Sequence, residues 1–239
     1  MGDIYVSVVI PAFNESHRLP QTLKEIRPWL DYKALPYEVV IVDDGSSDNT
    51  AGICREIAQG WKELRIEPRP HQGKGATVKH GALVARGDYI LIMDADHPTP
   101  IDSLDLMLPL MRDYDMVVGV RAFSGEEGSS GRGRRIIGLL QQLMAHVIVF
   151  KKSVADSQCG FKLFSRDCAQ RIFSRSRVEG GMYDVEIFCI AHNLNVRIYS
   201  KPVKWVNKEG STINILRCVV QDPFSLFHIR IMDELGRYR

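Results

Sequence analysis

Short apolar segments alternate with helix-like segments through the first 120 residues, and this alternation limits the possible folds more than any other feature. The apolar segments read as strands and lie at residues 6–10, 38–42, 64–67, 89–93 and 116–120. The helical patterns between them cover residues 19–30, 48–59, 74–85 and 101–112. Because strands that alternate with helices form βαβ units, the sequence predicts an α/β fold with a mostly parallel sheet.

Polar clusters follow three of these strands, at residues 11–15, 43–47 and 94–96. In an open parallel sheet, ligands bind outside the carboxyl ends of the strands. We therefore expect the three clusters to converge on one edge of the sheet and to form the functional site there.

Composition narrows the class of protein. The chain has 239 residues, of which 25% are charged and 45% hydrophobic, as in a globular protein of one domain. Its formal net charge of +2 gives no reason to expect a nucleic acid partner. Five cysteines without a C-x-x-C pair predict reduced, mostly buried thiols in a cytosolic setting. No signal peptide and no apolar run of about 18 residues is found, so we expect any membrane contact to be peripheral or through a partner.

Asp94 and Asp96 are separated by one residue and follow directly after the strand at 89–93. Carboxylate oxygens suit Mg²⁺ or Mn²⁺, and such an ion neutralises the charge of a diphosphate leaving group. A plain turn is the alternative, since Asp is frequent in turns. The apolar strand in front and the other polar clusters favour a metal site.

Asp43 and Asp44 stand at another strand end, where a carboxylate can accept a hydrogen bond from a nucleotide base or ribose. A loop, or a helix start capped by Asp48, explains them equally well. The glycine-rich segment 71–75 opens a helix, where free amides and Lys74 would bind an anion; a plain helix entry is the alternative.

The second half of the chain is less regular. Residues 124–135 read as a flexible loop, and the arginines around it match phosphate oxygens: Arg121, Arg132, Arg134 and Arg135. The apolar segment 136–150 has basic flanks, so it is either an interfacial helix or, as composition alone favours, a core helix. Cys159 reads as a packed thiol, and Asp184 and Glu186 as helix N-terminal charges.

Several of these motifs resemble family 2 inverting glycosyltransferases, which have the GT-A fold. The resemblance rests on the runs VVIPAFNE at 8–15, VDDGSSD at 42–48, GKG at 73–75 and DAD at 94–96. The runs DSQCGFKLF at 156–164 and YDVE at 183–186 are similar to the branch of dolichyl-phosphate β-glucosyltransferases and dolichyl-phosphate mannose synthases. The glucosyltransferases are the more similar, through the QCGFKLF run, Trp205 and residues 209–211.

The resemblance implies a role for each matching residue. It implies a single GT-A domain over residues 1–239, with a nucleotide-binding half at about 1–120 and an acceptor and sugar half at about 121–239. The implied nucleotide-binding residues are Pro11, Ala12, Asn14, Glu15, Asp43, Asp44, Lys74 and Asp94. The implied metal ligands are Asp96 and Asp94; the implied acceptor-phosphate residues are Arg121, Arg132, Arg134 and Arg135; and the implied sugar pocket holds Asp156 and Gln158. The implied catalytic set is Asp94, Asp96, Arg121, Asp156 and Asp184.

The implied reaction is transfer of one hexose from a nucleotide sugar, UDP-glucose being favoured, to a polyprenyl or dolichyl phosphate. The product would be a β-linked lipid phosphosugar, made by a peripheral enzyme on the cytoplasmic face of a membrane. GDP-mannose as donor, a polysaccharide or protein hydroxyl as acceptor, and a non-catalytic nucleotide-sugar sensor are the alternatives. His97 and Pro98 follow the acidic motif at once, which leaves the third metal ligand open, and the absent Q-x-x-R-W motif favours a single transfer.

Overall fold

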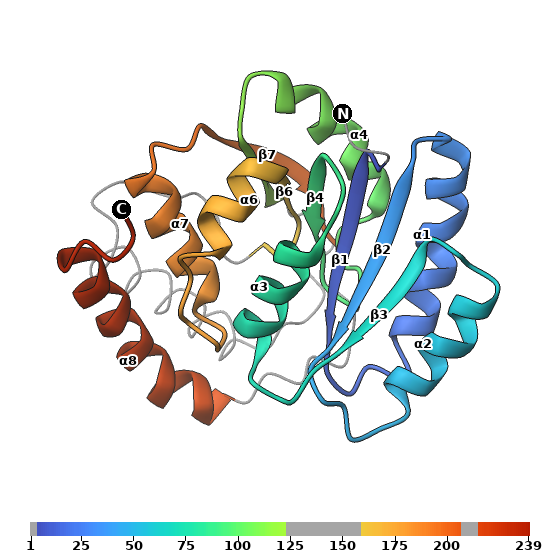
Figure 1. Ribbon diagram of the computed structural model, residues 1–239, viewed down its shortest axis with the longest axis horizontal. Helices are drawn as coiled ribbons and strands as arrows, with labels where there is room; N and C mark the ends of the chain where they lie inside the picture. The colour runs from blue at the N-terminus through green and yellow to red at the C-terminus, as the bar shows by residue number, and fades with distance from the viewer. Residues whose placement is uncertain (1–3, 123–158, 207–214) are drawn as a thin grey trace.

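The computed structural model describes residues 4–122, 159–206 and 215–239, which form one layered α/β structure (Figure 1). Within these residues a seven-stranded sheet has the order β3-β2-β1-β4-β6-β5-β7. Its strands are β1 (Val6–Ala12), β2 (Tyr37–Asp43), β3 (Leu64–Pro68), β4 (Tyr89–Ile92), β5 (Met116–Ala122), β6 (Lys162–Ser165) and β7 (Ile198–Lys204). The five strands predicted from the sequence are confirmed, and so is the α/β class.

The strand directions bring distant segments to the same edge. Strand β1 pairs in parallel with β2 and β4, and β2 pairs in parallel with β3. Strand β6 is antiparallel to both β4 and β5, so β5 again runs parallel to β4. Two reversals therefore return the carboxyl end of β5 to the edge where β1, β2 and β4 end. The sequence predicted the parallel pairs but not the reversed strand between them.

Helices cover both faces of the sheet. Figure 1 shows α1 (Leu19–Lys33) and α2 (Thr50–Gln59) on one side of β1 and β2, and α3 (Lys74–Val84) on the other. With α3 lie α6 (Arg166–Phe173), α7 (Tyr183–Asn193) and α8 (Ile215–Glu234). Every residue of β1 is buried, and alternate side chains enter the two cores: Val9 faces α3, whereas Val8 faces α1. This explains why the strand is a continuous apolar run rather than an alternating one.

One predicted helix is wrong. The pattern at 101–112 predicted a single helix, but the segment forms a 3₁₀ turn η1 (Ile101–Ser103), a short α4 (Leu104–Met107) and a second 3₁₀ segment η2 (Leu108–Arg112). Pro109 is the second residue of η2, and its missing N–H interrupts the hydrogen bonds of a continuous α-helix. Ile101, Leu104, Met107 and Met111 are buried, whereas Leu106 is exposed, so the segment still packs on the core although its backbone differs from the prediction.

Four cysteines lie in the described part of the chain, and all are buried free thiols: Cys54, Cys159, Cys168 and Cys189. Burial raises the pKa of Cys54 to about 11 and that of Cys168 to about 12. The prediction of packed, unreactive thiols is confirmed for these four. None of the described helices combines the length and the apolarity that a bilayer crossing requires.

Several predictions fall on residues outside the described ranges. They are the loop at 124–135, the helix at 136–150, the 209–211 turn, and the site residues Arg132, Arg134, Arg135, Asp156 and Gln158.

Replacing Gly81 by Ala tests how closely α3 packs on the sheet. A Cβ atom at Gly81 would lie 2.3 Å from Val9 Cγ1 and 2.9 Å from Val42 Cγ2. We expect Gly81→Ala to lower the free energy of unfolding by about 1–3 kcal/mol, as overpacking does, although Ala is the better helix former. Urea unfolding followed by circular dichroism measures this change.

Gly52 in α2 provides the matched control, because the nearest atoms to its added Cβ all belong to the Asn49 side chain, which can rotate away. Gly52→Ala should be neutral or stabilising by up to about 1 kcal/mol, the helix-propensity difference. The same effect for both substitutions would contradict the close packing of α3.

Candidate active site at the carboxyl edge of the sheet

Hydrogen bonds join the loop after β1 to the loop after β2. The backbone N–H of Asn14 donates to Ser46 Oγ at 2.9 Å, and Asn14 Oδ1 accepts from the N–H of Ser47 at 2.8 Å. Asn14 holds a φ of 56°, a left-handed conformation that Asn tolerates better than most residues. The predicted convergence of these two polar clusters is confirmed, and Asn14 is the residue that connects them.

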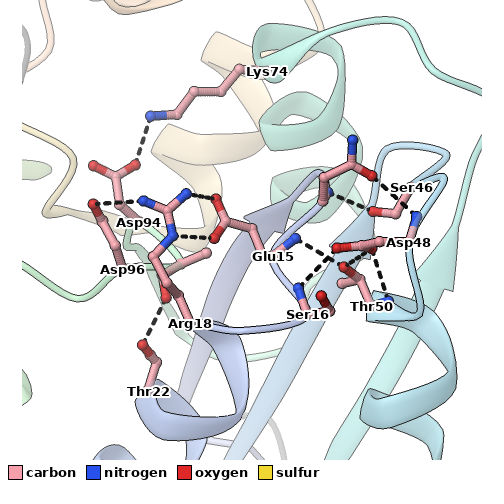
Figure 2. Close-up of polar contacts among 12 residues, drawn as sticks. Glu15, Ser16, Arg18, Thr22, Ser46, Asp48, Thr50, Lys74, Asp94 and Asp96 are labelled. Atoms are coloured by element: carbon pink, nitrogen blue, oxygen red, sulfur yellow. Dashed lines mark hydrogen bonds and ion pairs between the residues drawn. The ribbon is translucent and has the colours of Figure 1, made fainter. Parts of the chain in front are cut away.

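Asp48 extends this connection to the start of α1 and α2 (Figure 2). Its carboxylate accepts from the backbone N–H of Thr50 at 3.0 Å and from that of Ser16 at 3.2 Å. Burial is the largest single cause and raises the pKa of Asp48, but the hydrogen bonds from Thr50 and Ser16 together outweigh it and lower the pKa to about 2. The N-cap residue of α2 is Asn49 rather than Asp48, yet the Asp48 carboxylate still accepts the N–H of the first helical residue and fixes the loop that carries Glu15.

The acidic motif after β4 lies against two basic side chains. Lys74 Nζ donates to Asp94 Oδ1 at 2.6 Å, and Arg18 Nη1 lies 4.0 Å from Asp96 Oδ2 (Figure 2). Burial raises the pKa of Asp94, but the charge and hydrogen bond of Lys74 outweigh burial, so the pKa is lowered. Burial, and next the negative charge of Asp94, raise the pKa of Asp96. The two predicted metal ligands therefore share one small region, and their charges repel each other there.

Glu15 is linked to this region through Arg18. Both of its carboxylate oxygens accept hydrogen bonds from the Arg18 guanidinium, each at 2.7 Å. Burial raises the pKa of Glu15 although Arg18 opposes the shift. The sequence did not single out Arg18, because a base three residues after Glu15 looks like an ordinary ion pair on a helix surface.

Asp43 and Asp44 are both buried and already hydrogen-bonded within the chain. Asp43 Oδ1 accepts from Ser46 Oγ at 2.5 Å. The Asp44 carboxylate accepts from the backbone N–H groups of Gln72 and Gly73, each at 2.9 Å, and lies 2.8 Å from His71 Nδ1. Asp44 thereby fixes the segment that leads into α3, and any nucleotide contact of either residue stays a prediction.

The predicted anion site at the start of α3 is partly wrong. The N–H groups of Gly75 and Ala76 donate to the carbonyl of Glu179, at 2.7 and 3.3 Å. A Cβ on Gly73 would lie 2.6 Å from that carbonyl oxygen, and one on Gly75 would lie 2.2 Å from the carbonyl of Val178. The glycines therefore admit a neighbouring loop, and the amides that seemed free serve that loop; the Lys74 side chain still faces the site.

A second acidic residue of the predicted site, Asp184, is buried beside a lysine. Lys162 Nζ donates to Asp184 Oδ1 at 2.7 Å and to the carbonyl of Cys159, and its side chain is 1% exposed. Burial, opposed by the charge of Lys162 and then of Lys74, raises the pKa of Asp184. We predicted no function for Lys162 from the sequence, because a lysine in a strand is usually taken as solvent-facing.

Gly160 lies directly against Asp94. A Cβ there would be 1.9 Å from Asp94 Oδ2, so only glycine leaves room for that carboxylate. A small hollow opens beside the same pair of residues, lined by Met93, Asp94, His97, Pro98, Thr99, Gly160 and Phe161. Gly160 and Phe161 are therefore adjacent to the acidic motif, although about 65 residues separate them from it in sequence.

Arg121 reaches the same edge from the end of β5. Its guanidinium carbon lies 5.8 Å from the centroid of a Trp205 ring, within cation–π range. The charge of Arg121 is also among the causes that lower the pKa of Asp94, which places it in the electrostatic environment of the acidic motif. Two further predicted residues, Pro11 and Ala12, end β1 and are buried beside the end of β2.

Within the described ranges, no three His, Cys, Asp or Glu side chains converge in a way that could hold a metal ion, so no third ligand is identified there. His97, which follows the motif, is buried with its Nδ1 3.2 Å from Glu25 Oε2 on α1. An aromatic pair that the sequence did not single out joins the loop after β1 to the segment before α3. Phe13 stacks on His71 with centroids 4.3 Å apart, and 43% of Phe13 is exposed.

A family comparison identifies the class of protein to which the chain belongs. Residues 7–175 match the family model described as glycosyl transferase family 2, so the chain belongs to that family. The chain is therefore a glycosyltransferase, and the resemblance noted from the sequence is confirmed.

Relatives across eukaryotes are dolichyl-phosphate β-glucosyltransferases. The protein of that name from Dictyostelium discoideum is 32% identical over all of this chain and 78% of its own length. The Homo sapiens protein of the same name is 31% identical over 98% of this chain and 77% of its own length.

Solved structures place the fold among GT-A glycosyltransferases. Glucosyl-3-phosphoglycerate synthase from Mycobacterium tuberculosis, crystallised with Mn²⁺, UDP-glucose and phosphoglyceric acid, superposes with a TM-score of 0.69. It shares 18% identity, and the match covers 95% of this chain and 79% of that one. At this identity the likeness shows the fold, and the GT-A prediction is confirmed.

Replacing Asp48 by Ala tests the hydrogen bonds beneath Glu15. We expect Asp48→Ala to lower the free energy of unfolding at pH 7 by about 1 kcal/mol, the usual cost of a lost helix cap. Because the folded-state pKa is lowered to about 2, this contribution is present above the unfolded pKa of about 3.9 and is lost as the pH falls towards 2. Urea unfolding of both proteins between pH 7 and pH 2.5 measures the difference, and a difference that stays constant with pH would contradict the assignment.

Proposed function

We propose that the protein transfers one glucose from UDP-glucose to a dolichyl or polyprenyl phosphate, with inversion at the anomeric carbon, to give a β-linked lipid phosphosugar. The observation that carries the proposal is the meeting of Asp94, Asp96, Lys74 and Arg121 at one edge of the sheet. The names of the relatives support the acceptor, and the UDP-glucose complex of the structural neighbour supports the donor.

The acidic motif fits a divalent cation. Asp94 and Asp96 offer hard oxygen ligands, and the raised pKa of Asp96 reflects burial and then the negative charge of Asp94. We propose that these two residues hold Mg²⁺ or Mn²⁺; the structural neighbour was crystallised with Mn²⁺. When bound, the cation supplies positive charge to the diphosphate of the donor.

The nucleotide is proposed to lie along the loops after β1 and β2. Desolvation lowers the pKa of Lys74, but the charges of Asp94 and Asp184 outweigh it and raise the pKa, so the ammonium stays charged. The side chain is 44% exposed and faces the place proposed for a diphosphate. The exposed ring of Phe13 offers a face on which a base can stack. The residues that would line this part are Pro11, Ala12, Asn14, Glu15, Asp43, Asp44, Lys74 and Asp94.

The acceptor is proposed to bind at the carboxyl end of β5. A phosphate monoester is largely dianionic at pH 7, so it attacks without a strong general base, and positioning becomes the main task. Arg121 would hold that phosphate together with one of Arg132, Arg134 and Arg135, and Asp156 and Gln158 would flank the sugar. The burial of Asp184 against Lys162 supports this acceptor, because a carboxylate that is 7% exposed and bonded to Lys162 offers little access to a sugar hydroxyl.

The enzyme is proposed to work peripherally on the cytoplasmic face of a membrane, because its proposed acceptor is a membrane lipid. Helix α8 supports this with an exposed apolar stripe on the side away from its buried Leu226 and Ile229. The stripe consists of Phe224, Phe227 and Ile231, which are 75%, 62% and 39% exposed, and it continues into Leu235, 63% exposed, directly after the helix. Such a stripe on one helix face fits the boundary between lipid headgroups and acyl chains.

The direct test supplies purified protein with Mn²⁺, a polyprenyl phosphate, and either UDP-glucose or GDP-mannose in separate reactions. Mass spectrometry of the lipid fraction should show the hexosyl phosphate lipid with UDP-glucose. Product only with GDP-mannose would change the donor, and no lipid product with either donor would contradict the proposal.

Removing the Asp96 carboxylate should abolish transfer, because the motif loses one of its two proposed cation ligands. We expect Asp96→Ala to reduce the rate by at least about a hundredfold, as loss of one preorganised electrostatic contact does. Asp105→Ala is the control, since Asp105 is a surface carboxylate paired with Lys33 at 2.6 Å. Transfer at the wild-type rate by Asp96→Ala would contradict the cation assignment.

Polar substitution of the α8 stripe should weaken membrane binding without impairing the catalytic site. We expect Phe224→Ser/Phe227→Ser/Ile231→Ser to remain in solution when liposomes that bind the wild type are floated through a density gradient. Transfer to a short, water-soluble prenyl phosphate should stay at the wild-type rate. Unchanged flotation of the variant would show that α8 does not contact the bilayer.

A further inference from the structure

Glu186 is a fully buried carboxylate that the proposed reaction does not use. It lies in the first turn of α7 with 0% exposure, and its oxygens accept hydrogen bonds from two backbone N–H groups and one hydroxyl. The N–H of Arg177 donates to Oε1 at 2.8 Å and that of Val178 to Oε2 at 2.9 Å. The hydroxyl of Tyr238, the second-last residue of this sequence, donates to Oε1 at 2.7 Å. The sequence had suggested only a helix N-terminal charge.

These hydrogen bonds fix the side of the 176–180 loop that faces α7. The side that faces α3 is bonded to that helix, where the N–H groups of Gly75 and Ala76 donate to the carbonyl of Glu179. Lys79, one turn further along α3, donates to the carbonyl of Ser176 at 2.6 Å. The loop is thus held between a buried carboxylate on one side and the first turns of α3 on the other.

The first residue of α3 is Lys74, whose ammonium pairs with Asp94. Gly73 and Gly75 on either side of it have no room for a Cβ, because the carbonyls of Glu179 and Val178 press against them. A shift of the loop therefore moves the backbone of Lys74 directly. An unbroken set of contacts runs from Tyr238 through Glu186 and the loop to the lysine at the acidic motif.

We propose that Glu186, supported by Tyr238, is a positioning residue for the donor site: it fixes the 176–180 loop so that α3 presents Lys74 to Asp94 and to the donor diphosphate. The donor part of this inference rests on the proposed function, whereas the contact between the loop and α3 does not. Glu186 touches no reacting atom, so its loss should act on donor binding more than on the chemical step.

Two variants and a matched control test the inference. Glu186→Gln keeps the shape of the side chain but turns an acceptor into a donor that faces backbone N–H groups. Tyr238→Phe removes one hydrogen bond and keeps the ring, so it provides a milder change if Glu186→Gln folds poorly. Glu38→Gln is the control, because Glu38 is also a buried carboxylate, 4% exposed, and accepts a hydrogen bond from the backbone N–H of Arg86. Glu38 lies near the start of β2, at the opposite end of the strand from the site.

The first readout is hydrogen exchange, measured by mass spectrometry on peptides that cover residues 72–80 of the full chain. We expect Glu186→Gln and Tyr238→Phe to exchange faster there than the wild type, and Glu38→Gln to match the wild type in this segment. Unchanged exchange at 72–80 in both variants would overturn the coupling. This readout needs no substrate and stays decisive if the chain proves not to use UDP-glucose.

The second readout is steady-state kinetics with UDP-glucose and a polyprenyl phosphate. We expect the KM for UDP-glucose to rise about five- to tenfold in Tyr238→Phe, with kcat within about twofold of the wild type, since one hydrogen bond is lost outside the reacting centre. The KM for the lipid phosphate should not change. Faster exchange at 72–80 with an unchanged KM for UDP-glucose would overturn the positioning role, and absence of transfer by the wild type would instead refute the proposed function.

Discussion

The parallel pairing of β1 with β2 and β4 is the constraint on which the site depends. It brings the chain to the same edge after each strand, so the segments after residues 12, 43 and 92 meet there. The ion pair between Lys74 and Asp94 then joins the start of α3 to the end of β4 across that edge. Since β5 also runs in this direction, Arg121 reaches the same place from the second half of the chain.

The charges at this edge are balanced by neighbours rather than by solvent. Asp94 pairs with Lys74, Asp184 with Lys162, and Glu15 with Arg18. Asp96 makes a longer ion pair than these three, with its Oδ2 4.0 Å from Arg18, and its pKa is raised. An edge with one poorly neutralised carboxylate beside a paired one suits a ligand that brings a cation with it.

Sequence reasoning succeeded where a local pattern has one dominant physical cause. Buried parallel strands need continuous apolar residues, so β1 and β2 were recognised, and the acidic motif followed from its place after β4. It failed where distant contacts decide. Gly73 and Gly75 looked like an anion-binding helix entry, yet they make room for carbonyls about 100 residues away. The sequence predicted no contact for Lys162 or Tyr238, and only a helix N-terminal charge for Glu186. Their roles arise from pairs of residues that only the folded chain brings together.

The central claim is that the acidic motif binds the donor diphosphate together with a divalent cation. Isothermal titration of UDP into the wild-type protein, with and without Mn²⁺, tests it without requiring an acceptor or turnover. A shared site predicts that Mn²⁺ strengthens UDP binding by about 5- to 150-fold, and that UDP strengthens Mn²⁺ binding by the same factor. Equal affinity for UDP in the presence and absence of Mn²⁺ would contradict the account.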